Sequence, residues 1–219
     1  MNLVKTSLET NLNIFQDKNM YTHSVDTILL GNFVSLNSHV KNILDIGANN
    51  GALSIIVAQR QKHIHIDAIE IQEKAIKIAK MNVKMNHLQD KISLICNDFN
   101  IYVSMLTSEN IRKYDLIMSN PPFLKATDSS LKNKSDEIAI ATHEIKISLE
   151  QIIEGSSRII NNRGHLAIIH QNKKLHDIVK LMKKYGFDLK RTQTVKHFND
   201  RIEEPLVLIE GKYEVCDTS

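Results

Sequence analysis

The sequence predicts an α/β protein built on a mostly parallel sheet of seven strands, with an antiparallel hairpin at its C-terminal end. Apolar runs of strand length alternate with segments of helical periodicity, which is typical of βαβ units. A short connection separates the last two apolar runs, and short connections join antiparallel strands. The 219 residues can bury one substantial core, so we expect a single domain over residues 1–219.

The predicted core spans residues 41–219, and residues 1–40 form an extension that precedes it. Runs of apolar and β-branched side chains predict strands over residues 42–47, 64–70, 91–96, 114–119, 165–170, 188–196 and 205–210. Apolar side chains at three- and four-residue spacing predict helices over residues 24–36, 52–61, 71–83, 144–160 and 174–185. Asn162-Arg163-Gly164 predicts the turn into the fifth strand, and Gly186 is a candidate left-handed C-cap.

Charge and composition exclude several classes of protein. No apolar stretch has the length of a membrane span, and the N-terminus lacks the apolar region of a secretory signal. The two cysteines, Cys96 and Cys216, lie far apart without metal-ligand spacing. We therefore expect a cytoplasmic protein with reduced thiols and no metal ion.

Basic side chains are concentrated near the C-terminus. Residues 173–201, called the basic stretch below, hold nine Lys or Arg against three Asp, a local excess of +6 in a chain of net charge +3. Such a segment can follow a phosphate backbone. A solvated helix face explains the same charges and is favoured when the charge alone is considered.

The tetrapeptide Asn120-Pro121-Pro122-Phe123 directly follows the predicted strand 114–119. Two successive prolines can neither continue a helix nor donate to a sheet ladder, so they stop the strand abruptly. An amide, free carbonyls and an aromatic ring are thereby held at the carboxyl edge of the sheet, where open α/β sheets bind ligands. A rigid turn after an ordinary strand is the alternative explanation.

This tetrapeptide suits a reaction on an exocyclic amino group of a base. The lone pair of such an amine is delocalised into its ring, so the amine attacks well only when acceptors hold its N–H bonds. The side-chain oxygen of Asn120 and the carbonyl of Pro121 can supply two acceptors, while Phe123 stacks on the base. We therefore expect Asn120, Pro121, Pro122 and Phe123 to form the catalytic segment.

A glycine-containing loop follows the first core strand. It is Asp45-Ile46-Gly47-Ala48-Asn49-Asn50-Gly51, in which Gly47 and Gly51 permit a sharp turn and a close approach to a ligand. Asn49 tolerates left-handed backbone geometry better than other side chains do. Asp45, at the start of the loop, can accept from an amino group of a ligand. A loop of this kind is weak evidence alone, because nucleotide-binding and purely structural turns use it too.

Two more acidic residues follow the next two predicted strands. Glu70 can accept from both ribose hydroxyls, and Ile71 beside it can cover an adenine face. Asp98 can accept from an adenine amino group, and Phe99 can line the ring. Each acid also has a purely structural explanation: Glu70 can be a carboxylate at a helix start, and Asp98 an acidic loop residue. Features at the ends of four successive strands are harder to attribute to chance, and a dinucleotide enzyme would not explain the proline pair.

Together these motifs resemble the class I methyltransferases that use S-adenosylmethionine, with their Rossmann-like sheet. The loop is similar to the family's Asp-x-Gly-x-Gly-x-Gly, with Asn49 in place of the middle glycine, and Asn-Pro-Pro-aromatic resembles its amino-group signature. The resemblance implies that S-adenosyl-L-methionine is the cofactor and that residues 1–40 cover it. The implied cofactor-binding residues are Asp26, Asp45, Gly47, Asn49, Gly51, Glu70, Ile71, Asp98, Phe99 and Asn120.

Three segments resemble the bacterial tRNA methyltransferases that modify N6 of adenosine 37: residues 15–33, Ala141-Thr142-His143-Glu144 and residues 205–211. Thr142 stands where that family has Arg. The resemblance implies a tRNA-modifying enzyme that binds the anticodon stem-loop, best known for tRNA(Val), without a membrane or metal partner. Candidate RNA contacts are Tyr21, Lys125, His143, Lys173, Lys190 and Arg191. Guanine-N2 methyltransferases of ribosomal RNA, glutamine methyltransferases of release factors and a non-catalytic RNA-binding module remain alternatives.

Overall fold

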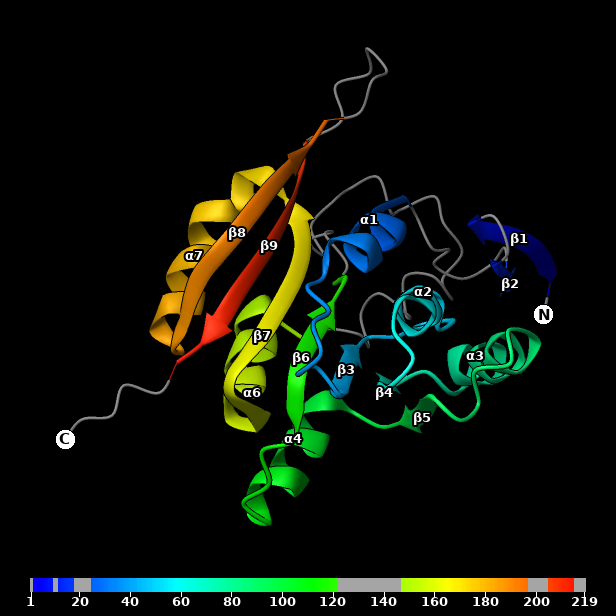
Figure 1. The fold of residues 1–219 in the computed structure, drawn as a ribbon, viewed down its shortest axis with the longest axis horizontal. Coiled ribbons are helices and arrows are strands. Elements are labelled where there is room, and N and C mark those ends of the chain that lie inside the picture. Colours follow the sequence, from blue (N-terminus) through cyan, green and yellow to red (C-terminus); the bar gives the residue numbers. More distant parts are fainter. Residues whose placement is uncertain (1, 10–11, 18–24, 122–146, 197–204, 215–219) are drawn as a thin grey trace, which may run out of the picture.

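The structure is a computed structural model, and it describes residues 2–9, 12–17, 25–121, 147–196 and 205–214. Its centre is a seven-stranded sheet with the strand order β5-β4-β3-β6-β7-β9-β8 (Figure 1). The strands are β3 (Asn42–Ile46), β4 (His65–Glu70), β5 (Ile92–Cys96), β6 (Tyr114–Ser119), β7 (Ile160–Gln171), β8 (Phe187–Val195) and β9 (Leu206–Tyr213). The first five strands in this order are parallel, and β9 is antiparallel to both of its neighbours. The predicted sheet and its C-terminal hairpin are confirmed.

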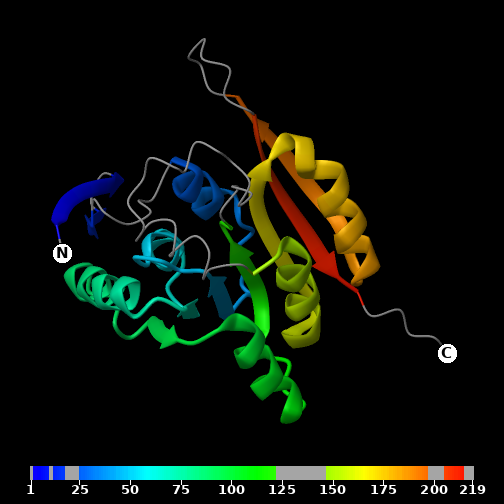
Figure 2. The same cartoon turned by 180° about the vertical axis from the view of Figure 1, so that it is seen from behind.

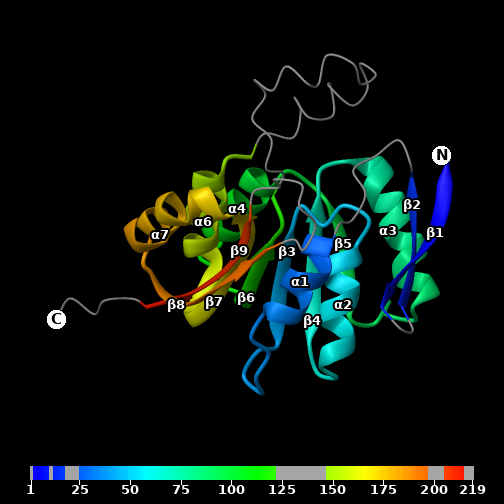
Figure 3. The same ribbon diagram turned by 90° about the horizontal axis from the view of Figure 1, so that it is seen from above.

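Helices cover both faces of the sheet (Figure 3). One face carries α1 (Val25–Phe33), α2 (Ala52–Arg60) and α3 (Glu73–Met85), and the other carries α4 (Phe99–Ser108), α6 (Leu149–Ile159) and α7 (Leu175–Lys184). A short 3₁₀ turn, η2 (Asn172–Lys174), precedes α7. Within the described residues no helix is long and apolar enough to cross a membrane.

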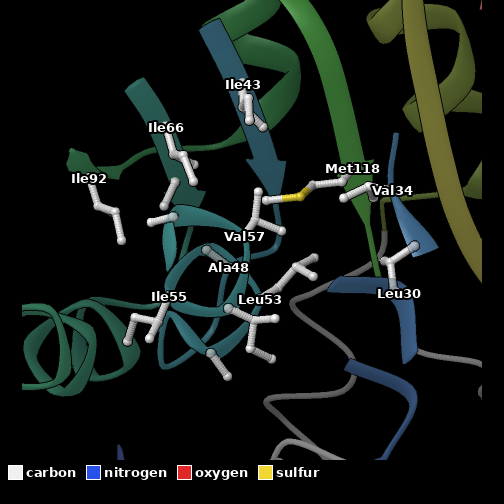
Figure 4. Packing of buried hydrophobic residues seen from close by; sticks show 14 of the residues in the cluster. Leu30, Val34, Ile43, Ala48, Leu53, Ile55, Val57, Ile66, Ile92 and Met118 are labelled. Atoms are coloured by element: carbon white, nitrogen blue, oxygen red, sulfur yellow. The ribbon is translucent and has the colours of Figure 1, made fainter. Parts of the chain in front are cut away.

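Successive side chains of the central strands enter two different cores, as the two-residue period of a strand requires. Ile43 packs with α2 on one face, whereas Leu44 belongs to the cluster that includes α6 on the other. Figure 4 shows the first core, in which Val57 of α2 lies near Met118 of β6. Because the central strands are buried on both faces, they are near-continuous apolar runs, which made them predictable.

An N-terminal hairpin was not predicted. It consists of β1 (Leu3–Glu9) and β2 (Leu12–Asp17), which pair antiparallel beside α3. The hairpin and the β8–β9 pair lie at opposite ends of the molecule (Figures 1 and 2). Long-range contacts hold the N-terminal hairpin beside α3. Lys74 of α3 lies 3.2 Å from Asp17, and Asn86, which directly follows α3, donates to the carbonyl of Asn13.

Several element boundaries differ from those predicted. Helix α4 was not predicted, and the helix expected over residues 144–160 begins at Leu149, where Ser148 and Gln151 form a capping box. Strand β7 starts at residue 160 rather than 165, and the expected turn at 162–164 is a register shift within it. Arg163 adopts φ +66° at that shift. Cys96 is a free, exposed thiol, and Cys216 lies outside the described residues.

Candidate active site

The carboxyl ends of four parallel strands meet at one edge of the sheet. Ile46 of β3 pairs with Ile69 of β4 and with Ser119 of β6, and Glu70 pairs with Cys96 of β5. This register brings the segments that follow β3, β4, β5 and β6 together, as the motif spacing predicted.

The loop after β3 has the left-handed backbone that its sequence predicted. Gly47, Asn49 and Gly51 adopt φ values of +72°, +50° and +81°. The backbone N–H groups of Gly47 and Ala48 both donate to the carbonyl of Ile69, at 3.0 Å each, which ties the loop to β4. Replacement of the expected middle glycine by Asn49 is therefore accommodated, because asparagine tolerates this region.

Gly47 has open space beside it in the described part of the chain. A Cβ added to this residue would meet no heavy atom of the described residues within 4 Å, whereas one added to Gly51 would lie 3.5 Å from Ala79. Gly47 therefore leaves room for a ligand directly above the loop, as a close backbone approach requires.

Gly47→Ala is expected to weaken the binding of S-adenosylhomocysteine by about tenfold or more, because the new methyl group enters the ligand space. The positive φ also costs about 1–2 kcal/mol of stability. Gly186, with φ +83° after α7, is the matched control. Calorimetry should show that Gly186→Ala loses stability but not affinity; equal affinity losses in the two variants would contradict the assignment.

Asp45 lies beneath the loop and is buried. Its carboxylate accepts from the hydroxyl of Ser54 at 2.6 Å, and from the backbone N–H of the same residue, at the start of α2. Burial raises the pKa of Asp45 to about 7, against the opposing effect of the Ser54 hydrogen bonds. The nearby charge of Glu70 raises it further. Asp45 thus fixes the loop from below.

The raised pKa makes the stability of the protein pH-dependent. The folded state holds the Asp45 proton more tightly than the unfolded chain does, so this contribution is full below pH 3.8 and is lost as the pH rises to about 7. Urea unfolding should show wild-type stability falling relative to Asp45→Asn over this range, by roughly 2–4 kcal/mol. A constant difference between the two proteins would contradict this environment for Asp45.

Glu70 is placed to hold a ligand and the loop together. One carboxylate oxygen accepts from the backbone N–H of Asn49 and the other from that of Gln72, both at 2.9 Å. The residue is 6% exposed, and burial raises its pKa despite these hydrogen bonds. The carboxylate also accepts from the backbone N–H of Ile71, which leaves part of its capacity of about four acceptor sites for a ligand. Ile71 follows and is 42% exposed, so its apolar side chain is accessible to a ligand.

Asp98 and Phe99 have different environments. Asp98 caps α4, where Oδ1 accepts from the backbone N–H groups of Asn100 and Ile101 at 2.7 and 3.1 Å. Phe99 is 6% exposed and belongs to the core between α4 and α6, where a Cβ on Gly155 would lie 2.6 Å from its ring. The expectation that Phe99 lines an adenine does not fit this placement, because its ring packs inside the protein.

Asn120 directly follows β6 and carries an unusual amide. Its Nδ2 donates to Oγ1 of Thr27 at 3.1 Å, whereas Oδ1 is buried without a partner among the described residues. An unsatisfied buried acceptor costs about 1–3 kcal/mol, so its presence requires an explanation. Pro121 is buried beside it. The amide oxygen is thus available to a donor on a ligand.

The remaining sequence-predicted residues divide into three groups. Tyr21, Pro122, Phe123, Lys125 and His143 lie outside the described residues. The second group is Asp26 alone, which lies in the first turn of α1, next to Thr27. The third group is Lys173 on η2 and Lys190 on β8, which are both exposed.

Arg191 has a structural role that the sequence did not indicate. It bonds Glu210 of β9 at 2.8 Å and the carbonyl of Phe33, and it stacks on the Phe33 ring at 4.0 Å. Burial opposes the ionisation of Glu210, but hydrogen bonds from His165, Arg191 and Ser35 outweigh it and lower the pKa of Glu210. Arg191 therefore anchors the end of α1 to the sheet, and its expected RNA contact does not follow from this position.

Sequence reasoning missed Thr27 and Asn82. The side chain of Asn82, in α3, is fully buried; it donates to the carbonyls of Asn50 and Phe15 and accepts from the N–H of Phe15. It therefore joins the loop after β3 to the N-terminal hairpin. One signal was visible: Asn82 is a polar residue on the apolar stripe formed by Ile78, Ala79 and Val83. Thr27 offered no such signal.

The strand order, the left-handed loop and the acid after β4 define the class of protein: an S-adenosylmethionine-dependent methyltransferase with the class I fold. The chain belongs to the methyltransferase small domain family, whose model matches residues 8–198.

Comparisons with individual proteins agree with this class. The chain is 31% identical to the tRNA1(Val) (adenine(37)-N6)-methyltransferase of Aliivibrio fischeri, over 79% of this chain and 70% of that one. It is also 31% identical to the enzyme of the same name from Dyadobacter fermentans, over 85% of this chain and 73% of that one.

Solved structures share the fold. The methyltransferase SMU.776, complexed with SAH, gives a TM-score of 0.68 at 15% identity, covering 96% of this chain and 56% of that one. The tRNA m1G37 methyltransferase of M. jannaschii gives a TM-score of 0.65 at 20% identity, covering 98% of this chain and 57% of that one.

Proposed function

We propose that this protein transfers a methyl group from S-adenosylmethionine to N6 of adenosine 37 in tRNA, with tRNA(Val) as the first candidate. The observation that carries the proposal is the buried Oδ1 of Asn120, which is left without a described partner at the end of β6. Relatives that match this chain over 70% or more of their own length carry the name tRNA1(Val) (adenine(37)-N6)-methyltransferase.

The residues at the sheet edge fit the cofactor, which supplies an electrophilic methyl group when bound. Glu70 accepts from the ribose hydroxyls, Ile71 covers the adenine, and Asp98 accepts from its amino group while capping α4. Gly47, Asn49 and Gly51 shape the loop for the methionine part. Asp45, in its ionised form, favours the positive amino group of that part, and Asp26 covers the site from α1.

Catalysis rests on orientation of the target amine. Oδ1 of Asn120 and the carbonyl of Pro121 accept the two N–H bonds of N6, which directs the nitrogen lone pair out of the ring plane and towards the methyl group. The nitrogen becomes positively charged once it is methylated and then loses a proton readily. A strong general base is therefore not required.

The adenine reaches this amide by leaving its stack in the anticodon loop. Phe123 then stacks on the flipped base, which contributes about 1–3 kcal/mol in other systems. Pro122 fixes the turn that presents Phe123. These two residues lie outside the described part of the chain, so their roles rest on the motif.

The tRNA contacts that we propose come from several segments of the chain. Lys173 on η2 and Lys190 on β8 are exposed, positively charged side chains that we assign to phosphates. Lys174 and Lys184 are paired with Asp177 and Glu150, which reduces the free charge of the basic stretch. We also propose that Tyr21, Lys125 and His143 contact the anticodon stem-loop.

Incubation with methyl-labelled S-adenosylmethionine and tRNA from cells that lack this modification tests the proposal. Nucleoside mass spectrometry should detect labelled N6-methyladenosine, and nuclease mapping should place it beside the anticodon. Label in N2-methylguanosine would overturn the choice of base. Absence of label in tRNA, with label in ribosomal RNA or a release factor, would overturn the choice of substrate.

A further inference from the structure

We propose that Thr27 is a positioning residue for methyl transfer: its hydroxyl holds Nδ2 of Asn120, so that Oδ1 faces the amine to be methylated. This inference rests on the proposed function and adds a residue from the N-terminal extension to its machinery.

The two ends of the Asn120 amide are chemically different. Nδ2 can only donate and Oδ1 can only accept, so the direction of the amide decides whether the substrate amine finds an acceptor. Nδ2 lies 3.1 Å from Oγ1 of Thr27, and Oδ1 is buried without a partner in the described part of the chain. The Thr27 hydroxyl therefore occupies the donating end and leaves the accepting end for a ligand.

Thr27 lies on a firmly held helix. Gly31, one turn further along α1, packs so closely on α2 that an added Cβ would lie 2.7 Å from Ile56. Arg60 of α2 donates to the carbonyls of Gly31 and Val34, and Arg191 of β8 donates to that of Phe33.

These contacts fix α1 against both α2 and the sheet. Thr27 itself is buried, so its hydroxyl has a defined position. Asn120 is similarly fixed by its place after β6, where the hydroxyl of Ser119 bonds the carbonyl of Ile46. The hydrogen bond thus joins two rigid elements that are 93 residues apart in the chain, which suits a positioning role.

Thr27→Val and Thr27→Ser separate the hydroxyl from the shape of the side chain. Valine has nearly the same shape without the hydroxyl, and serine keeps the hydroxyl. We expect Thr27→Val to lower kcat for tRNA methylation by about 10- to 100-fold with little change in the KM for tRNA or the affinity for S-adenosylhomocysteine. Thr27→Ser should restore most of kcat. Thr6→Val, the same change in β1, serves as the matched control.

Equal kcat in Thr27→Val and wild type would overturn the inference. A loss of kcat that serine does not restore, or a parallel loss of cofactor affinity, would also overturn it, because packing rather than the hydroxyl would then be responsible.

A spectroscopic measurement keeps the inference testable if tRNA is not the substrate. The side-chain ¹⁵N resonance of Asn120, assigned with Asn120→Asp in the cofactor-product complex, should shift in Thr27→Val and return in Thr27→Ser. An unchanged resonance in Thr27→Val overturns the positioning role. Failure of wild type to methylate tRNA, with a shifted resonance, instead overturns the proposed substrate alone.

Discussion

Replacing Asn120 with alanine is expected to lower methyl transfer by about 10²–10³-fold while the affinity for S-adenosylhomocysteine stays within about twofold of wild type. The change removes Oδ1, which has no partner in the described part of the chain and which we assign to the target amine. The side-chain bond that is lost joins Nδ2 to Thr27 and does not involve the loop after β3. Single-turnover kinetics and calorimetry on the same preparations measure the two effects separately.

Asn42→Ala is the matched control, because Asn42 begins β3 at the opposite edge of the sheet. It should leave both turnover and cofactor affinity unchanged. If Asn120→Ala instead loses cofactor affinity in proportion to turnover, Asn120 holds the cofactor rather than the amine, and the proposed mechanism is wrong.

Glu70→Gln is expected to weaken S-adenosylhomocysteine binding by roughly 10²-fold. Hydrogen bonds to a charged group contribute about 1.5–3 kcal/mol each, and the carboxylate keeps acceptor capacity for the ribose. The substitution also turns one oxygen into an NH₂ group, which cannot accept from the N–H of Asn49 or Gln72. The loop after β3 loses support at the same time.

Glu73→Gln makes the same chemical change at an exposed position in the first turn of α3. Titration calorimetry should find its affinity close to that of wild type. An affinity for Glu70→Gln that equals that of Glu73→Gln would mean that the acid after β4 does not contact the ligand.

The sheet and its carboxyl edge were predictable because their signals are local. Each central strand is a near-continuous apolar run, and the residues that follow it are the ones that lie at the edge. Asn49 was expected to tolerate left-handed backbone geometry because of its own preference, and its φ is +50°.

Other features depend on partners that are far away in the sequence. The N-terminal hairpin is held by Asn82 and Lys74 of α3, and the amide of Asn120 is held by Thr27. Periodicity carries no information about such pairs.

Phe99 and Arg191 show a second limit of sequence analysis. An aromatic ring after a strand can line a ligand or fill a core, and an arginine in a basic segment can bind phosphate or close a buried network. The packing of Phe99 on α6 and the bonds of Arg191 to Glu210 and Phe33 are tertiary contacts, which decide between these roles. No pattern of neighbouring residues distinguishes them.

The most direct test of the central claim uses a tRNA(Val) anticodon stem-loop transcript with adenosine at position 37, and a second transcript with guanosine there. After incubation with S-adenosylmethionine, mass spectrometry of nuclease fragments should find one methyl group on N6 of adenosine 37 in the first transcript and none in the second. Methylation of both transcripts, or of another atom or position in the first, would contradict an amide site built for the amino group of adenosine 37.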